Sequence, residues 1–427
     1  MVQLCVVAVT LAVAAGAGEA EEIALGDALA ELDRANPGIE QARSRAEEAA
    51  AVVGQARAAL VPSLSAQASY VRNSEDAVMR LGPPLVAEPR DVVIQPLDAL
   101  GAAATLRVPL VVPHAWYDVE SARGGARAAS ATADAARRQA RAAFAQAAYG
   151  ARAAEELVVA SEHALASAGE LARSAERRVK AGTAPTLDAL RARTEHVRRE
   201  SDLARARAEL GRARLALGVL LGRGGPVRVA VPDDAPPPAE AGSEDAAVGA
   251  LARRPEVAAR TAQVDAARAQ VRSSRARLAP QLSASGSLFA QDVPYPTGEK
   301  SGWRASVDLV WPLFDGGLRE ARRREARAKL GTAEAAAEEQ RLAVLQEVAD
   351  ATRDEEVARE RLRLAETQRQ LAADAAASAR RSFEAGVASS LDVIDANDRE
   401  YAADVALADA RARLAQARVA LDRAAGR

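Results

Sequence analysis

Two copies of one structural plan make up this chain, and the internal repeat constrains its fold more than any other feature. Pro, Gly and Leu-Asp landmarks occur in the same order in both halves. The paired landmarks are Pro37 and Pro255, Pro62 and Pro280, Pro109 and Pro312, and Gly182 and Gly386. The spacing shortens only between the second and third pairs, so the halves differ in length at one place, as expected for a surface loop.

We assign residues 18–222 to the first repeat and residues 246–427 to the second. The connector, residues 223–245, is rich in Pro, Gly and Asp and is predicted to be irregular. Each repeat reads as a helix, two strands, a very long helix and a further helix. The first helix of the first repeat is expected over 24–61.

The long helices are predicted at residues 115–180 and 317–384, and shorter ones follow at 186–222 and 390–425. A helix of this length would extend about 100 Å, and such helices need neighbours along their whole length. Small and apolar residues spaced three and four apart suggest a packing seam along Leu187, Leu190, Thr194, Val197, Ser201, Ala204 and Ala208.

Four short segments instead alternate with a period of two. They are predicted as strands at about 63–72, 102–110, 281–291 and 302–312. In the last segment Trp303 and Trp311 share an apolar face, while Arg304, Ser306 and Asp308 lie on the other. This pattern is typical of a strand between lipid and water, with the two tryptophans in aromatic girdles; a two-sided soluble sheet is the alternative.

Four strands are too few to close a membrane barrel, because about eight is the smallest workable number. Open strand edges are not tolerated in lipid. If the strands enter a membrane, several copies of the chain must therefore complete the wall, and three copies would supply twelve strands.

The N-terminal residues 1–17 resemble a signal peptide, although no Lys or Arg precedes the apolar run. A buried helix or a membrane anchor are the alternatives. Cys5 is the single cysteine and lies inside this segment, so disulfides and thiolate metal sites are not expected in the processed chain. Cys5 also lies too early in the run to resemble a lipid-attachment site. A net charge of −2 gives no general attraction to nucleic acid.

The doubled plan resembles the TolC-type outer-membrane factors. The most specific segments are Trp311-Pro-Leu-Phe-Asp-Gly-Gly317 and Phe383-Glu-Ala-Gly386-Val-Ala-Ser-Ser-Leu-Asp392-Val-Ile-Asp395. The resemblance implies a mostly α fold with a membrane β-barrel: a coiled-coil helical barrel plus four β-strands per protomer, closing as twelve strands in a homotrimer. It also implies location in the cell outer membrane, with the helical tunnel in the periplasm.

By the same resemblance, the chain would be the passive exit duct of a tripartite efflux pump. Its partners would be a periplasmic adaptor (membrane fusion protein) and an inner-membrane pump of the resistance-nodulation-division or ABC type. Two alternatives stay open: the exit duct of a type I protein secretion system, and a soluble coiled-coil scaffold.

Gly182 and Gly386 stand where a long helix reverses, and glycine accepts the left-handed conformation of such a helix end. Thr186 or Ser390 is expected to cap the helix that follows. The resemblance implies that these turns dock the adaptor; ordinary turn chemistry is the simpler explanation. The expected docking residues are Gly182, Thr183, Thr186, Leu187, Gly386, Val387, Ser390 and Leu391.

Asp392 and Asp395 lie one helical turn apart beside the second turn. The resemblance implies that three copies place six carboxylates around a cation-selective constriction; two solvated acids at a helix start are the alternative. Phe383 and Ala388 occupy positions where a tyrosine and an arginine form latches in well-known relatives, so that latch is not expected here.

The sequence shows no catalytic motif. His114, His163 and His196 have no ligand-spaced partners, and no phosphate-binding glycine loop or nucleophile elbow occurs. We therefore expect neither enzymatic activity nor a cofactor.

Overall fold

The computed structural model describes residues 22–83, 88–232, 244–292 and 299–427. The proposed signal peptide and Cys5 lie outside these residues. The chain divides into two compact units. We call Gln41–Ala135 with Leu251–Leu345 the sheet unit, and Met1–Glu40, Ala136–Ala250 and Gln346–Arg427 the tip unit.

The helices follow the duplicated plan. In the first repeat they are α1 (Leu25–Ala35), α2 (Pro37–Ala58), α3 (Pro113–Lys180) and α4 (Thr186–Leu220). The second repeat contains α5 (Glu244–Arg253), α6 (Pro255–Ala276), α7 (Leu318–Glu384) and α8 (Ser390–Ala424). None of the helices in the described part of the chain combines the length and apolarity needed to cross a membrane.

The helix expected over 24–61 is interrupted at Asn36. A residue before proline disfavours the helical conformation, and Asn36 precedes Pro37. Its side-chain oxygen accepts hydrogen bonds from the amides of Gly38 and Ile39 at 2.9 and 3.1 Å, and its amide group donates to the Leu220 carbonyl at 2.7 Å. Asn36 thus begins α2 and ties the break to α4.

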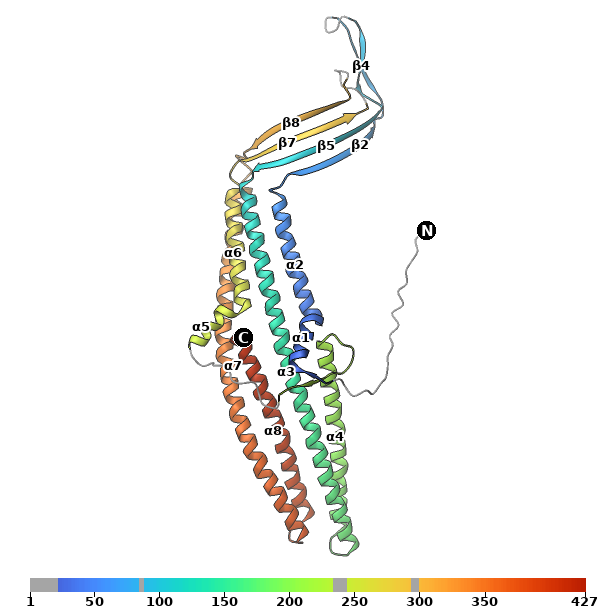
Figure 1. Ribbon diagram of the computed structural model, residues 1–427, viewed down its shortest axis with the longest axis vertical. Coiled ribbons are helices and arrows are strands. Elements are labelled where there is room, and N and C mark those ends of the chain that lie inside the picture. Colours follow the sequence, from blue (N-terminus) through green and yellow to red (C-terminus); the bar gives the residue numbers. More distant parts are fainter. Residues whose placement is uncertain (1–21, 84–87, 233–243, 293–298) are drawn as a thin grey trace. The chain divides into compact units, whose positions relative to one another are not determined.

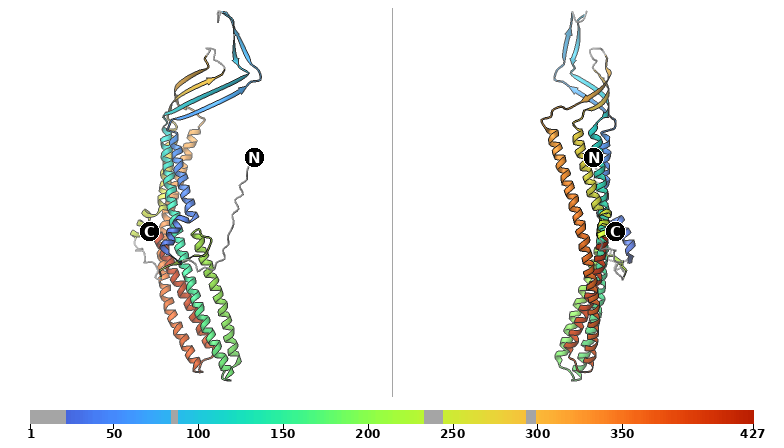
Figure 2. Two further views of the ribbon diagram at one scale, coloured as in Figure 1. Left: turned by 45° about the vertical axis from the view of Figure 1, so that its right-hand side comes forward. Right: turned by 90° about the vertical axis from the view of Figure 1, so that its left-hand side faces the viewer.

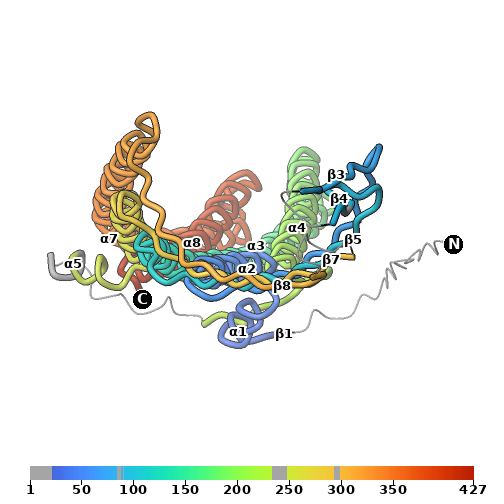
Figure 3. Tube along the Cα trace, turned by 90° about the horizontal axis from the view of Figure 1, so that it is seen from above, coloured from blue at the N-terminus to red at the C-terminus, as the bar shows by residue number. Residues whose placement is uncertain are grey.

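The sheet unit holds a four-stranded antiparallel sheet in the order β2–β5–β7–β8 (Figures 1 and 2). Its strands are β2 (Ser63–Arg72), β5 (Asp98–Val111), β7 (Gln281–Gln291) and β8 (Ser301–Val310). The central β5–β7 pair joins the two repeats. Helices α2, α3, α6 and α7 follow one another in that order across this unit (Figure 3).

Two strand pairs were not expected from the sequence. A hairpin of β3 (Ala77–Leu81) and β4 (Arg90–Gln95) occupies the longer loop of the first repeat. In the tip unit, β1 (Glu22–Ala24) pairs in parallel with β6 (Arg228–Ala230), which lies in the connector predicted to be irregular.

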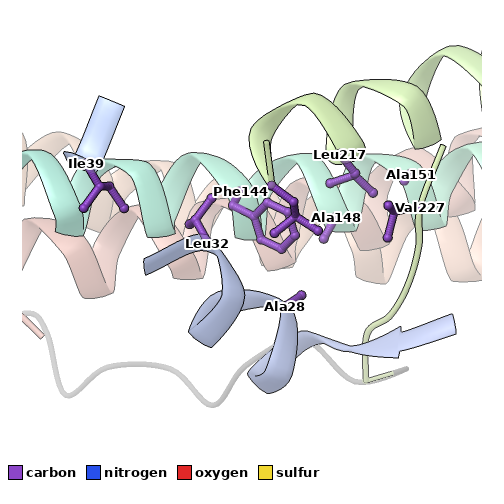
Figure 4. Packing of buried hydrophobic residues seen from close by; sticks show 9 residues of the cluster. Ala28, Leu32, Ile39, Phe144, Ala148, Ala151, Leu217 and Val227 are labelled. Atoms are coloured by element: carbon purple, nitrogen blue, oxygen red, sulfur yellow. The ribbon is translucent and has the colours of Figure 1, made fainter. Parts of the chain in front are cut away.

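The core of the tip unit is thin and built mainly of small residues. Where α1 meets α3 and α4, Leu32, Phe144 and Leu217 are fully buried and point toward one another (Figure 4). Asp33 beside them accepts bonds from Arg137 and Arg141, which hold the pKa of its carboxyl below the usual value despite partial burial.

Candidate functional site

The register of the four-stranded sheet sorts its side chains into two chemically different faces, because neighbouring residues on a strand point to opposite sides. One face carries rows of apolar residues across all four strands. Two of these rows are Leu64, Leu106, Gly286 and Ala305, and Ala66, Ala104, Leu288 and Trp303. These large side chains are exposed in the protomer; Trp303 is 75% exposed and Leu64 also 75%.

The opposite face is polar. Two of its rows are Ser65, Thr105, Ser287 and Arg304, and Ser63, Arg107, Ser285 and Ser306; the row Gln67, Ala103, Phe289 and Gly302 is less polar. The hydroxyls of Ser285 and Ser306 are hydrogen bonded at 2.9 Å, and Ser306 donates to Asp308 at 2.9 Å. One face of the sheet thus suits an apolar surrounding and the other suits water.

The sheet has two open edges, because β2 and β8 each pair with one neighbour only among the described strands. Trp303 lies within β8, whereas Trp311, predicted to be in the strand, lies just past its end. The Trp311 indole donates to the Leu278 carbonyl at 3.2 Å, and its ring stays exposed.

The two long helices of the tip unit end in the same backbone motif. Gly182 and Gly386 have φ angles of 72° and 77°. The amide of Thr183 donates to the Arg178 carbonyl at 2.9 Å, and the amide of Val387 donates to the Ser382 carbonyl at 2.9 Å. Each is a Schellman turn, which needs the positive φ that glycine provides.

The helix caps differ from the prediction. The N-cap residues are Pro185 and Ser389, and Thr186 and Ser390 are instead the first helical residues. Pro185 offers no side-chain hydrogen bond, whereas Ser389 forms a capping box with Asp392. The prediction of Thr186 and Ser390 was wrong by one position because composition locates a helix start only approximately.

The predicted docking residues form two groups. Val387 is 85% exposed, and Leu187 and Leu391 are also exposed, so these turns present apolar side chains to solvent. Ser390, by contrast, is fully buried, and its hydroxyl donates to the Asp188 carboxylate at 2.9 Å. This bond joins the start of α8 to the start of α4.

Asp392 and Asp395 are both exposed in the protomer. The Ser389 hydroxyl donates to Asp392 at 2.7 Å and the Ser389 amide at 2.8 Å, and these bonds hold the pKa of Asp392 below its usual value. Asp395 pairs with Arg399 at 2.8 Å. Asp392 therefore stays ionised while it caps the helix.

Sequence reasoning missed a contact between the two turns. The Arg178 guanidinium donates to the Phe383 carbonyl at 2.8 Å and lies over the Phe383 ring, 4.6 Å from its centre. Phe383 itself is buried. Arg178 gives no motif in the sequence, because its partners are a backbone carbonyl and a ring more than two hundred residues away.

A second missed feature is a buried ion cluster between α4 and α8. Arg199 is only 3% exposed. It pairs with Glu195 at 2.7 Å, with Asp202 at 3.4 Å and with Asp398 of α8, and lies 4.5 Å from the centre of the Tyr401 ring. We call Glu195, Arg199, Asp202 and Asp398 the α4–α8 ion cluster.

The seam proposed on α4 is not the face buried in the protomer. Leu187, Leu190 and Val197 are exposed, whereas the buried face of α4 carries Ala192, Glu195, Arg199, Leu203 and Ala206. The apolar spacing misled because the inner face includes the ion cluster. No group of three or more His, Cys, Asp or Glu side chains arranged for a metal occurs in the described residues.

Comparison with known proteins defines the class. The outer membrane efflux protein family matches residues 28–223 and 247–427, so the chain belongs to this family. This membership confirms the resemblance to TolC-type channels and the predicted location in the outer membrane. No curated protein sequence matches the chain significantly.

Solved structures share the fold. The outer membrane protein VceC of Vibrio cholerae is 21% identical, with a TM-score of 0.77 over 94% of this chain and 96% of that chain. The CmeC outer membrane channel of Campylobacter jejuni is 17% identical, with a TM-score of 0.79 over 94% and 85%. The MtrE outer membrane channel of Neisseria gonorrhoeae is 22% identical, with a TM-score of 0.76 over 94% and 88%. The predicted fold class, long helices with a four-stranded sheet in two repeats, is confirmed; the β1–β6 and β3–β4 pairs are additional.

Proposed function

We propose that three copies of this chain form a channel-tunnel in the outer membrane, the passive exit duct of a tripartite efflux pump. The observation that carries the proposal is the sheet: one exposed apolar face, one polar face and two open edges. Lipid would cover the apolar face, and β8 of one copy would pair with β2 of the next until twelve strands close.

The polar face would then line the water-filled lumen. Arg107 and Arg304 would project into it, together with the serine and threonine hydroxyls of the same rows. Membership in the efflux family favours exported small solutes over a scaffold role. The energy for export would come from the inner-membrane partner.

The turns around Gly182 and Gly386 would form the entrance and dock the adaptor. The exposed Leu187, Val387 and Leu391 supply apolar contact area for a partner helix tip. Six carboxylates, Asp392 and Asp395 from each copy, would surround the entrance and favour cations.

Cysteine cross-linking between sheet edges tests the assembly. In a Cys5→Ser background, Gln67→Cys on β2 is combined in turn with Arg304→Cys, Ser306→Cys or Asp308→Cys, which share the polar face of β8. At one position, oxidation should produce a disulfide-linked species of three copies. Gln67→Cys alone is the matched control and should give no such species. Linked dimers alone, or monomers at all three positions, would refute the trimeric barrel.

A further inference from the structure

The passage from β8 into α7 carries an unusual run of exposed apolar and then cationic side chains. Leu313 is 77% exposed and Phe314 89%, and Trp311 and Leu318 are exposed beside them. Residues 318–329 follow with six basic and two acidic residues, although the whole chain carries a net charge of −2. The basic residues are Arg319, Arg322, Arg323, Arg324, Arg327 and Lys329.

Three of these cations are already used locally. Arg319 pairs with Asp315 at 2.7 Å, Arg323 with Glu320 at 3.1 Å and Lys329 with Glu325 at 2.6 Å. Among the described residues, no salt bridge joins Arg322, Arg324 or Arg327 to a carboxylate, and all three are exposed; the charge of Arg322 only helps Lys329 to lower the pKa of Glu325. Counted together with Asp315, the run therefore holds six cations and three anions, an excess of three positive charges.

Helix stability does not explain this excess. Cations near a helix N-terminus oppose the helix dipole, and α7 begins at Leu318. The equivalent start of α3 in the first repeat, residues 115–126, contains two acids, Asp118 and Glu120, and one base, Arg123. The cationic run therefore belongs to the second repeat alone and is not required by the shared backbone plan.

The apolar and aromatic residues are followed along the chain by basic residues, and this order is the one expected where a protein leaves a membrane. Aromatic residues favour the boundary between hydrocarbon and headgroups, and basic residues next to a membrane attract anionic lipids. Arg327 lies within about 14 Å of the start of α7 along the helix axis, close enough for long side chains to reach a headgroup layer. The cations follow directly after the end of the apolar sheet face.

We propose that the first three turns of α7, with Trp311, Leu313 and Phe314 ahead of them, bind the phosphate headgroups of anionic phospholipids. The proposal rests on the proposed function, in which the sheet spans the bilayer. The guanidiniums of Arg322, Arg324 and Arg327 hold the phosphates, and the apolar residues anchor the passage in the acyl region.

Tryptophan quenching tests this site. The chain has three tryptophans, so Trp116→Phe with Trp303→Phe leaves Trp311 as the reporter beside the cationic run. The trimer is reconstituted in phosphatidylcholine vesicles that contain a minor fraction of brominated phosphatidylglycerol or of brominated phosphatidylcholine. Brominated phosphatidylglycerol should quench Trp311 at least about twofold more strongly at low salt, and the difference should vanish at high salt.

The triple variant Arg322→Gln, Arg324→Gln, Arg327→Gln should lose this preference. The matched control Arg353→Gln, Arg361→Gln, Arg363→Gln removes the same charge from exposed positions farther along α7 and should keep it. An unchanged preference in the first triple variant, or an equal loss in the control, would overturn the site. If neither lipid quenched Trp311 in any protein, the membrane location of the sheet would fail instead.

Discussion

The hairpin of α3 and α4 and the hairpin of α7 and α8 have the same backbone but different polar chemistry. Both reverse through a glycine at positive φ and a Schellman turn. Beyond the turn, the first repeat has Asp188 and Arg191, whereas the second has Asp392 and Asp395 at the equivalent positions. The duplicated backbone thus preserves the turn while the charges on it have diverged.

The same divergence occurs inside the helix pair. When the repeats are aligned on Gly182 and Gly386, position 199 of α4 is equivalent to position 403 of α8. Both positions are buried, but the first repeat has Arg199 there and the second has Ala403. Arg178 and Arg199 of the first repeat both bind groups of the second, Phe383 and Asp398. The first repeat supplies cations to the contact, and the asymmetry makes the two hairpins complementary.

Of the changes that test this difference between the repeats, replacing Arg199 should have the largest effect on the free energy of unfolding. Arg199→Leu leaves Glu195, Asp202 and Asp398 without their central cation, and removing one partner of a buried ion pair costs about 3–5 kcal/mol. Arg193→Leu, which removes only a surface pair with Glu176 at 3.7 Å from the same helix, should cost less than about 1 kcal/mol. Urea unfolding followed by circular dichroism in detergent measures both.

Adding Asp398→Asn to Arg199→Leu should restore part of the lost stability, because it removes one of the carboxylates that lost Arg199 and leaves Arg198 to Glu195. Equal costs for Arg193→Leu and Arg199→Leu would show that the α4–α8 ion cluster contributes no more than a surface pair.

The two turns should also differ in their effect on ion flow. Asp392→Asn with Asp395→Asn should weaken block of single-channel current by a trivalent cation by about tenfold, because several like charges around one opening sum their fields. Asp188→Asn is the control from the first repeat, and it should change block by less than about twofold. It removes one carboxylate per copy, and that side chain is only 18% exposed, whereas Asp392 and Asp395 are exposed. Unchanged block in planar bilayers after the double substitution would remove Asp392 and Asp395 from the conduction path.

The features that could be predicted from sequence are those set by local pattern. The strands β2 and β7 and the helices α3 and α7 follow from alternation, from prolines and from long proline-free runs. The left-handed glycines at 182 and 386 follow from the turn that each must make. These signals need no knowledge of a distant partner.

The structural features that could not be predicted from the sequence depend on contacts between residues far apart along the chain. The β1–β6 pair joins two three-residue strands some two hundred residues apart, each too short to show a period. The inner face of α4 was misjudged because Glu195 and Arg199 read as solvated charges until Asp398 and Tyr401 of α8 are placed beside them. The Arg178 contact was missed for the same reason.

The smallest expected effect is a pH dependence of the protein's stability that arises from Glu195, on the α4 side of the α4–α8 contact. Burial raises the pKa of the Glu195 carboxyl, and the nearby Asp398 carboxylate raises it further, while Arg199 and Arg198 act in the opposite direction. A carboxyl whose pKa is raised in the folded state binds its proton more tightly there than in the unfolded chain, so folding is favoured as the pH falls. The contribution of Glu195 to the midpoint temperature of unfolding should therefore rise slightly from neutral pH toward the ordinary glutamate pKa of 4.5.

Glu195→Gln should flatten this rise. What remains comes from Asp422, whose pKa burial also raises, and from His114, whose pKa burial lowers and which disfavours folding as the pH falls below 6.5. Glu170→Gln, an exposed position on α3, should keep the full rise. The lowered pKa of Asp33 acts with the opposite sign, but its stabilisation is lost only as the pH falls below its ordinary value of 3.8, outside this window. Circular dichroism melts across the window decide the matter: an equal pH dependence of the midpoint in the wild type and in Glu195→Gln would mean that Glu195 remains ionised within the cluster, with Arg199 and Arg198 outweighing its burial.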